Sequence, residues 1–549
     1  MHRLSFVPFT FLSLVVGCFF VSSSLLIFAH VARPVGVHAH FDWPDEMMNA
    51  FFAERFALTG TFAAPTITAA QDFVRPRSFN VVHGMLAPGG FLGLPFWYGV
   101  IVRLVGTNAT LFVTPLLGTL ALLVVFSFLR SFVNVRTGLI GAFLVAIHPA
   151  WWYYSAYSYL PNVPFVALCL FSLWFGVRAV KRQRLVDAVL CGACFSIALS
   201  LRTNELLWMS VLVAACAYVG RVWKSSKTML VVVGSAVLFF LPILWFQHQT
   251  FGSAFVTGYS RFVGEGVVAQ PIVTAPSEFE TLSHDPIVIA IRAMTFPYGI
   301  HPRAVWYNLS RSWLWLAPWM SIPMLGAATW SLVFFWRRGS RQTRFLLVAS
   351  LAAAGLLIVS YGSWMLQDAL VLRLNTIGIS HVRYWLPLVF FFTPALAVFL
   401  GRMWEKKSWQ RIVVVAYCIV SLFLSARMVF FSEAESLVAV AGRLRAYDTA
   451  AAIIVSQTPA DAVIVTDRTD KEIFPDRAVT PGLPTTQEGT AAALQPFVTS
   501  LKLYAYLPND KSRIMDLQST LGLPTHMGDP LFYFAAEPRP GFGLFGLSR

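Results

Sequence analysis

The chain has 549 residues, of which 57% are hydrophobic and 12% are charged. Apolar runs of about 20 residues recur along its whole length, more than one soluble core could bury, so the sequence predicts an integral membrane protein and excludes a soluble globular one. The formal net charge is +15, but the basic residues gather in short loops between the apolar runs, which argues against nucleic acid as a partner.

The hydropathy pattern predicts eleven membrane-spanning helices. In chain order they cover residues 8–30, 109–129, 137–153, 162–178, 185–201, 205–220, 228–246, 313–336, 345–361, 386–401 and 412–431. A further apolar segment, residues 87–106, is interrupted by Pro and Gly and contains Arg103, so we interpret it as an interfacial or re-entrant helix. The expected fold class is therefore an α-helical polytopic membrane protein with about 11 to 13 transmembrane helices.

The basic residues also predict the orientation. Loops rich in Lys and Arg alternate with loops poor in them, so the positive-inside rule places the amino terminus in the cytoplasm and, after eleven spans, the carboxyl terminus outside. Of the 26 acids, only Asp187 and Glu405 then fall on the cytoplasmic side. Two long loops, residues 31–108 and 247–312, become extracytoplasmic, and connections of this length are usually functional.

The tail after the last span has a different pattern. The stretch "AVAGRLRAYDTAAAIIVSQT" has helical spacing, while "ADAVIVTDR" and "PLFYFAA" read as strands. We therefore divide the chain into a transmembrane domain, residues 1–431, and a small extracytoplasmic α/β domain, residues 432–549. The strand followed by "TDR" is too weak a pattern to indicate a nucleotide site.

The first long loop opens on an acidic stretch, "HFDWPDEMMNAFFAERFALTG", residues 40–60. Asp42 could cap a helix that has Pro44 in its first turn and ends at Gly60, with an apolar stripe along the outer membrane surface. One capping carboxylate suffices, however, whereas Asp42, Asp45 and Glu46 crowd together and raise one another's pKa.

Such crowding favours catalysis or cation binding. The neighbouring His38 and His40 could join a metal set, but they have no regular ligand spacing, so no dedicated zinc site is predicted.

The layout resembles the GT-C superfamily of integral-membrane glycosyltransferases, and within it the dolichyl-phosphate-mannose protein mannosyltransferase and aminoarabinose transferase type. The matching text is "DWPDEMMNAFFAERFALTGTFAAP", "HGMLAPGGFLGLPFWYGVIVRLVG", "ALSLRTNELLW" and "HVRYWLPLVFFFTPALAVFLG". The resemblance implies a GT-C-like fold in the plasma (inner) membrane. It also implies inverting transfer of a sugar from a polyprenyl-phosphate-linked donor to a lipid, glycan or protein acceptor on the outer face.

By this match Asp45 is expected to be the general base, with Glu46 and Asp42 as neighbours that tune or replace it. The donor phosphate needs cations, and the expected residues are Arg383 and His381 of "SHVRYWLP", with Arg303 of the second long loop as a weaker candidate. Arg383 could instead snorkel to the interface. Arg202 and Glu205 are predicted to form a structural ion pair.

The sequence departs from the family pattern at one position, and the need for a metal ion stays open. Many relatives carry an acid in the next outer loop, where this chain has Asn162, so no metal site is predicted. No cofactor is certain, and a divalent cation stays open as an alternative. The aromatic stretch "WWYYSAYSY" is predicted to be an interface belt.

Three rival functions also stay open. The main one is a membrane transporter or lipid flippase, which predicts ionisable residues at mid-span and matching broken helices in two halves. The span centres are almost free of charge and no such symmetry is visible. The others are a cell-surface glycan polymerase or ligase and a non-catalytic assembly subunit.

Overall fold

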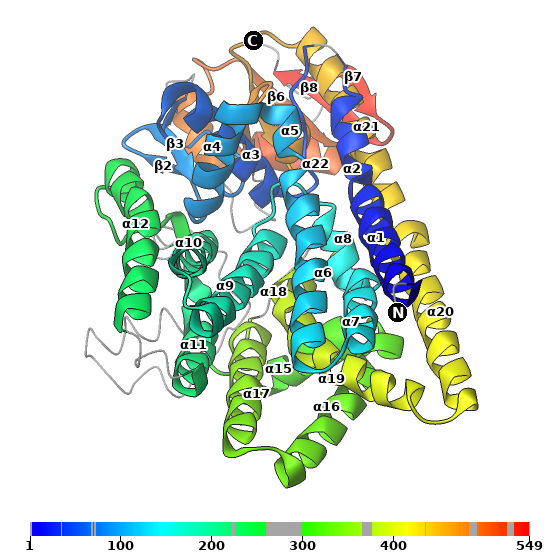
Figure 1. The fold of residues 1–549 in the computed structure, drawn as a ribbon. Coiled ribbons are helices and arrows are strands. Elements are labelled where there is room, and N and C mark those ends of the chain that lie inside the picture. The colour runs from blue at the N-terminus through cyan, green and yellow to red at the C-terminus, as the bar shows by residue number, and fades with distance from the viewer. Residues whose placement is uncertain are drawn as a thin grey trace. The chain divides into compact units, whose positions relative to one another are not determined.

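The computed structural model of the protein describes residues 3–34, 36–66, 70, 73–220, 226–259, 299–364, 376–433, 435–481, 491–523 and 532–547. Most of this chain is helical (Figure 1). It divides into two compact units, each made of three separate segments: Met1–Leu25, Phe112–Leu241 and Pro271–Ala439 in the first, and Leu26–Leu111, Pro242–Gln270 and Val440–Arg549 in the second. The first long loop thus folds with the carboxyl-terminal region, a grouping that differs from a division at residue 431.

The first unit is helical. Its helices are α1 (Arg3–Ser23), α6 (Val113–Phe132), α7 (Val135–Ala146), α8 (Pro149–Ser155), α9 (Asn162–Arg182), α10 (Leu185–Leu201), α11 (Leu206–Gly220), the larger part of α12 (Ser226–Phe251), α15 (Pro302–Leu309), α16 (Pro318–Arg338), α17 (Arg341–Gly362), α18 (Ser380–Tyr384), α19 (Leu386–Trp404) and α20 (Ser408–Phe431). A 3₁₀ turn, η1 (Thr203–Glu205), and a π-helical turn, η3 (Ser310–Leu314), complete it. Adjacent helices pack closely, notably α9 with α10, α6 with α7 and α11 with α17.

Nine helical segments in the described part of the chain are long and apolar enough to cross a membrane. They are Pro8–Val31, Thr107–Phe132, Asn162–Arg182, Thr203–Gly220, Ser226–Phe251, Pro318–Arg338, Arg341–Gly362, Leu386–Trp404 and Ser408–Phe431. Each coincides with a predicted span, so the polytopic helical architecture is confirmed. Basic residues lie in the last turns of α6, α9, α16 and α19, among them Arg130, Arg182, Arg337 and Arg402.

The two remaining predicted spans are shorter helices. α10 has 17 residues and α7 only 12, and at 1.5 Å per residue α7 is about 18 Å long, well short of the roughly 30 Å of a bilayer core. The prediction of one continuous helix over residues 137–153 was wrong because His148, which precedes Pro149, is extended with φ −66° and ψ 118°. The chain restarts as α8.

The apolar segment at residues 87–106 also forms no long helix. It begins in a strand, and its helix, α4 (Gly93–Val105), has 13 residues, which is about 20 Å by the same rise and too short to span. α4 packs closely on α3 (Pro44–Thr59) because Gly99 has no side chain: a Cβ there would lie 2.8 Å from the carbonyl oxygen of Ala53.

The second unit contains two sheets. Besides α3 and α4, its first segment holds α2 (Leu25–Val31), α5 (Thr107–Thr110) and the strands β1 (Ala64–Pro65), β2 (Phe79–Val82) and β3 (Met85–Pro88), which form an antiparallel sheet in the order β1-β3-β2. Its last segment holds α21 (Leu437–Gln457), β4 (Val463–Thr466), η4 (Asp470–Glu472), β5 (Ala478–Pro481), η5 (Ala491–Phe497), β6 (Leu503–Pro508), α22 (Lys511–Thr520), β7 (Phe532–Arg539) and β8 (Phe542–Leu547).

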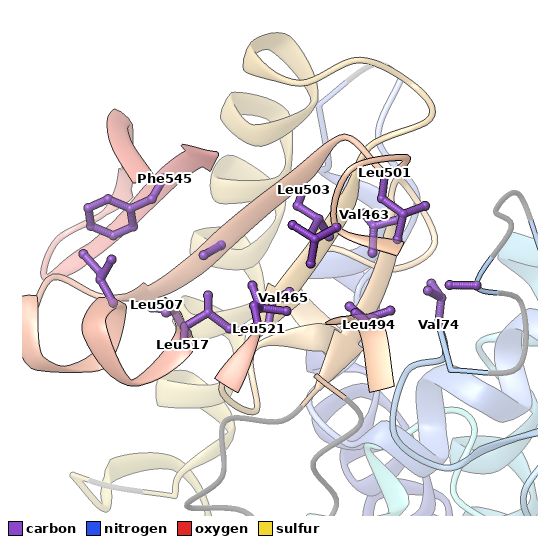
Figure 2. Close-up of a cluster of buried hydrophobic side chains, with 14 residues drawn as sticks. Val74, Val463, Val465, Leu494, Leu501, Leu503, Leu507, Leu517, Leu521 and Phe545 are labelled. Atoms are coloured by element: carbon purple, nitrogen blue, oxygen red, sulfur yellow. The ribbon is translucent and has the colours of Figure 1, made fainter. Parts of the chain in front are cut away.

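The five carboxyl-terminal strands form one sheet in the order β5-β4-β6-β8-β7. The β5-β4-β6 part is parallel and the β6-β8-β7 part antiparallel, so the predicted α/β character of this region is confirmed. Its core contains Val463 and Leu503 of the sheet and Leu517 of α22, and Val74 of the first loop packs into the same core (Figure 2).

Helix α3 begins and ends where the sequence predicts, but two details differ. Its N-cap is Trp43 without a side-chain hydrogen bond, so the expectation that Asp42 caps it was wrong; Gly60 ends it in the left-handed conformation, with φ 72°. The predicted surface stripe is largely internal, because Met47 and Phe52 are buried in the unit while Leu58 is exposed.

Candidate active site

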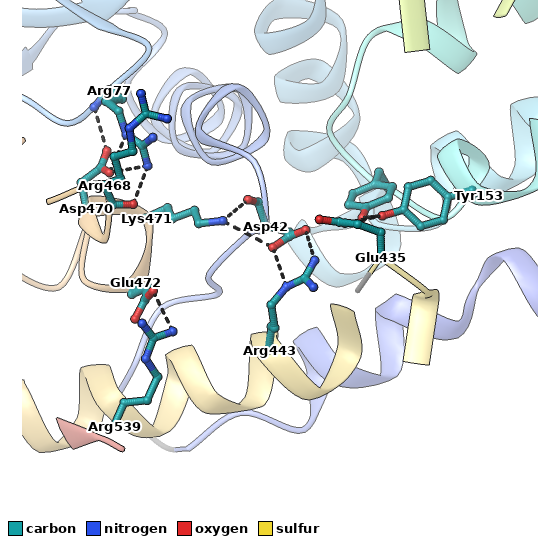
Figure 3. Close-up of polar contacts among 11 residues, drawn as sticks. Asp42, Arg77, Tyr153, Glu435, Arg443, Arg468, Asp470, Lys471, Glu472 and Arg539 are labelled. Atoms are coloured by element: carbon teal, nitrogen blue, oxygen red, sulfur yellow. Dashed lines mark hydrogen bonds and ion pairs between the residues drawn. The ribbon is translucent and has the colours of Figure 1, made fainter. Parts of the chain in front are cut away.

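Asp42 is held by two cations of the carboxyl-terminal region (Figure 3). Its Oδ2 lies 3.0 Å from Nη2 of Arg443 on α21, and its Oδ1 lies 3.4 Å from Nζ of Lys471. Burial alone would raise the pKa of the Asp42 carboxyl, but the charges of Lys471 and Arg443 outweigh it and hold the pKa below its usual value. A buried carboxylate paired in this way acts as an anchor and is a poor proton acceptor.

Asp45 has a different environment. It lies in the first turn of α3, is half-buried, and its Oδ1 accepts a hydrogen bond of 2.7 Å from the hydroxyl of Ser78. Glu46, the next residue, is buried. The three acids that crowd together in the sequence therefore have three different environments, and Asp45 is the one among them whose side chain is not buried.

His38 and His40 bind carboxylates of the carboxyl-terminal region. His38 Nδ1 lies 2.6 Å from Asp476 Oδ1, and the buried His40 lies 3.0 Å from Asp448 and 3.3 Å from Asp476. Within the described ranges, no group of three or more His, Cys, Asp and Glu residues is arranged to hold a metal ion. The two histidines thus join the loop to α21 and to the segment before β5.

These contacts predict a pH-dependent stability. Burial lowers the pKa of His40, but hydrogen bonds to Asp448 and Asp476 outweigh it and raise the pKa above 6.5. A group whose pKa is raised in the folded state stabilises it fully below the unfolded-state pKa and loses that contribution as the pH rises through the folded-state pKa. The temperature of the unfolding midpoint in detergent is therefore expected to decrease as the pH rises above about 6.5.

The change His40→Gln should flatten this dependence. His83→Asn is the matched control, since His83 is exposed and has φ 51°, which Asn tolerates. A His40→Gln protein that kept the full alkaline loss would contradict the role given to this pair.

In the first unit, the expected phosphate-binding residues Arg383 and His381 both lie on α18. Arg383 is buried, with its guanidinium carbon 5.1 Å from the centre of the Tyr384 ring. Asn162, at the start of α9, donates a hydrogen bond of 3.1 Å to the main-chain oxygen of Arg383. Asn162 therefore holds the backbone segment that carries this arginine.

The His381 ring forms a hydrogen bond to the main chain. Its Nε2 lies 3.1 Å from the carbonyl oxygen of Trp364, an atom that only accepts, so Nε2 carries the proton. The same oxygen accepts a hydrogen bond from Asn308 of α15. Arg303, on the same helix, is exposed. Neither Asn308 nor Trp364 had a recognisable sequence signal.

Arg202 and Glu205 form the ion pair expected from the sequence. Arg202 Nε lies 2.7 Å from Glu205 Oε1, and both side chains are buried. Arg202 also donates to the hydroxyl of Tyr361 at 2.6 Å, while Trp208 donates to the other Glu205 oxygen. The guanidinium lies 4.9 Å from the ring of Tyr384, the residue that also covers Arg383.

Breaking this pair is expected to destabilise the protein strongly. Arg202→Met leaves the Glu205 carboxylate buried without its countercharge, which costs about 3–5 kcal/mol of unfolding free energy. The half-exposed pair of Arg136 and Glu405, 3.7 Å apart, provides the control: Arg136→Met should cost less than about 1 kcal/mol. Unfolding in detergent compares the two, and equal losses would contradict the buried pair's role.

The stretch "WWYYSAYSY" is not an interface belt. Trp151, Tyr153 and Tyr159 are buried. Tyr153 shares a 2.6 Å hydrogen bond with Tyr157 and donates to Glu435 at 3.3 Å (Figure 3). Buried tyrosines need hydrogen-bond partners, and one partner of Tyr153, Glu435, lies 282 positions away in the sequence.

Comparison with known proteins gives a family match and a fold match. A family model described as dolichyl-phosphate-mannose-protein mannosyltransferase matches residues 94–246. The structure is similar to the crystal structure of ArnT from Cupriavidus metallidurans in the apo state, with a TM-score of 0.58 and 12% identity over 100% of this chain and 98% of that one. No curated protein matches in sequence.

Two further structures are similar. ArnT from the same organism bound to undecaprenyl phosphate has a TM-score of 0.58 and 12% identity over 98% of this chain and 97% of that one. The second is archaeal oligosaccharyltransferase AglB from Archaeoglobus fulgidus, in complex with an inhibitory peptide and a dolichol-phosphate. It has a TM-score of 0.48 and 11% identity, over 94% of this chain and 71% of that one. The family model agrees with the resemblance drawn from the sequence over residues 94–246, and the fold of the chain is similar to that of ArnT.

Proposed function

We propose that this protein is a glycosyltransferase, of the hexosyl or pentosyl type, that moves a sugar from a polyprenyl-phosphate-linked donor to an acceptor on the outer face of the membrane. The observation that carries the proposal is the placement of Asp45, half-buried and hydrogen-bonded to Ser78, on a fold shared with ArnT. A shared fold alone does not establish an activity. The proposed activity therefore rests on the Asp45 carboxylate as the general base.

The proposed reaction is a single displacement with inversion. Asp45 takes the proton of the acceptor hydroxyl as that oxygen bonds to the anomeric carbon. The bond between the anomeric carbon and the phosphate oxygen breaks, and the polyprenyl phosphate leaves with its electron pair. Arg383 is proposed to stabilise the charge that develops on the leaving phosphate. The reaction as proposed requires no metal ion.

The proposed setting is the plasma (inner) membrane. The basic helix ends favour a cytoplasmic amino terminus and an extracytoplasmic carboxyl-terminal region. The polyprenyl chain of the donor would remain in the bilayer, while the acceptor, a lipid, glycan or protein, would reach Asp45 from the outer aqueous phase.

Purified protein in liposomes tests the proposal. The liposomes carry tritium-labelled mannose, glucose, galactose or a pentose linked to undecaprenyl phosphate, and lipid, glycan and peptide acceptors are supplied. The expected result is one labelled sugar on the acceptor and an equal amount of free undecaprenyl phosphate. Movement of intact donor across the bilayer without transfer would favour the flippase, and growth of a sugar chain would favour the polymerase.

A further inference from the structure

The loop that follows β4, residues 467–472, contacts two segments on either side of Asp45 in the second unit. Lys471 donates to the main-chain oxygen of Asp42, in addition to its ionic contact with the carboxylate. Asp470 accepts two hydrogen bonds from Arg77, of 2.9 Å from the main-chain nitrogen and 2.7 Å from Nε (Figure 3). Adjacent residues of this loop, which we name the β4 loop, thus bind two chain segments that are distant in sequence.

Both bound segments lead directly to Asp45. Asp42 lies three residues before it, at the entrance to α3. Arg77 is followed by Ser78, whose hydroxyl donates to the Asp45 carboxylate at 2.7 Å. The β4 loop therefore fixes the start of α3, which carries Asp45, and the segment that carries Ser78, its hydrogen-bond donor.

The contacts are partly buried, and each of those between side chains joins a cation to a carboxylate. The side chain of Asp470 is fully buried and that of Lys471 is 17% exposed. The guanidinium of Arg77 also donates to the main-chain oxygen of Arg468 at 2.6 Å. Charge-assisted hydrogen bonds of this sort fix geometry more firmly than neutral ones.

The β4 loop is itself supported by the sheet. Glu472 accepts a hydrogen bond of 3.2 Å from the hydroxyl of Tyr506 on β6 and lies 3.1 Å from Arg539 on β7. Thr469 donates to the main-chain oxygen of Tyr506 at 3.4 Å. A functional group is held accurately when its supporting residues are themselves fixed by a rigid element.

The backbone at these contacts is in a rarely populated conformation. Ser78 and Arg468 both have φ of 64°, in the left-handed region that residues other than glycine seldom adopt. Such conformations persist only where surrounding contacts enforce them, and they gather at functional sites. Here they direct the Ser78 hydroxyl to Asp45 and the Arg468 carbonyl oxygen to Arg77.

We propose that Asp470 and Lys471 are positioning residues for Asp45, so that the carboxyl-terminal region sets the geometry of the general base. This inference rests on the proposed function. It assigns to the "DRTDK" stretch after β4 the role of fixing two segments of the first loop, and it makes the carboxyl-terminal region a requirement for catalysis.

A double-mutant cycle tests the inference. In the liposome assay, with the undecaprenyl-phosphate sugar that the wild type uses, Lys471→Ala is expected to lower kcat by about 10–100-fold and to leave the KM for the donor nearly unchanged, because misplacement by about 1 Å costs that much. Lys471→Arg, which keeps the charge, should recover part of the rate. In the Asp45→Asn background, Lys471→Ala should have no further effect on the residual rate.

One control variant makes the result specific, and a second variant replaces Lys471→Ala if that protein does not fold. Lys502→Ala removes a lysine that pairs with Asp461 at 2.9 Å but is half-exposed, so it should leave kcat unchanged. If Lys471→Ala does not fold, as judged by its unfolding midpoint in detergent, Asp470→Asn takes its place in the same cycle.

The outcomes separate the inference from the function on which it rests. An unchanged kcat in folded Lys471→Ala and Asp470→Asn, or the same fold loss with and without the Asp45 carboxylate, would overturn the positioning role while leaving the proposed function intact. Full activity of Asp45→Asn alone would overturn the proposed base and the positioning role together.

Discussion

Replacing Asp45 by Asn is expected to lower the rate of sugar transfer by about 10²–10⁴-fold, because the amide cannot take the proton of the acceptor hydroxyl. The amide oxygen can still accept the hydrogen bond from Ser78, so the local fold should persist. The KM for the donor should change little, since the base acts on the acceptor. Steady-state transfer from a labelled polyprenyl-phosphate sugar measures both quantities.

The matched control is Glu54→Gln, the same chemical change on the same helix. The sequence suggests that Glu54 is a solvated position near Arg55; it is in fact half-buried, and burial, opposed by His38 and Arg33, raises its pKa. Glu54 has no assigned part in the reaction, so the rate of sugar transfer by Glu54→Gln should stay near that of the wild type. Equal losses in the two variants would indicate a general effect of α3 rather than loss of a base.

Arg383→Gln is expected to produce the second large loss, about 10–100-fold in kcat/KM for the donor. A hydrogen bond to a charged group contributes about 1.5–3 kcal/mol, and each 1.4 kcal/mol is tenfold. Arg383→Lys should restore part of the loss, since it keeps the charge but lacks the planar fork that suits phosphate. Donor titrations with each variant measure the effect.

Arg341→Gln is the control for charge alone, because Arg341 is exposed at the opposite end of the predicted topology. Arg303→Gln should cost less than Arg383→Gln, since Arg303 is exposed whereas Arg383 is buried. If Arg383→Gln lowers stability but leaves kcat/KM unchanged, the arginine only snorkels or packs on Tyr384.

The parts of the fold that local sequence determines were predictable. Continuous apolar runs identify the nine long helices found among the described residues, since a helix satisfies all of its backbone hydrogen bonds within one segment inside a bilayer. Pro44 and Gly60 mark the ends of α3 because both act through backbone geometry. Pro149 indicates the break in the helix predicted over residues 137–153, but a hydropathy average over many residues does not detect a single proline.

The site depends on contacts that no local pattern contains. Asp42 has the sequence signature of a helix cap, but its partners Arg443 and Lys471 lie 401 and 429 positions further along the chain. Tyr153 reads as part of an aromatic belt until Glu435, 282 positions away, is placed beside it. Arg202 and Glu205 were predictable as a pair because they are three residues apart.

The second long loop is only partly described. Residues 260–298 of the predicted loop at 247–312 lie outside the described residues. The neighbouring segments are described and show Arg303 on α15 and Asn80 donating to the carbonyl oxygen of Gly258 at 3.0 Å.

Transfer by wild-type and Asp45→Asn proteins, assayed side by side in liposomes with tritium-labelled polyprenyl-phosphate sugars, is the most direct measurement of the central claim. The predicted result is labelled acceptor with an equal amount of released polyprenyl phosphate for the wild type, and both products reduced together by about 10²–10⁴-fold for the variant. Full transfer by Asp45→Asn, or donor that crosses the bilayer intact with the wild type, would contradict it.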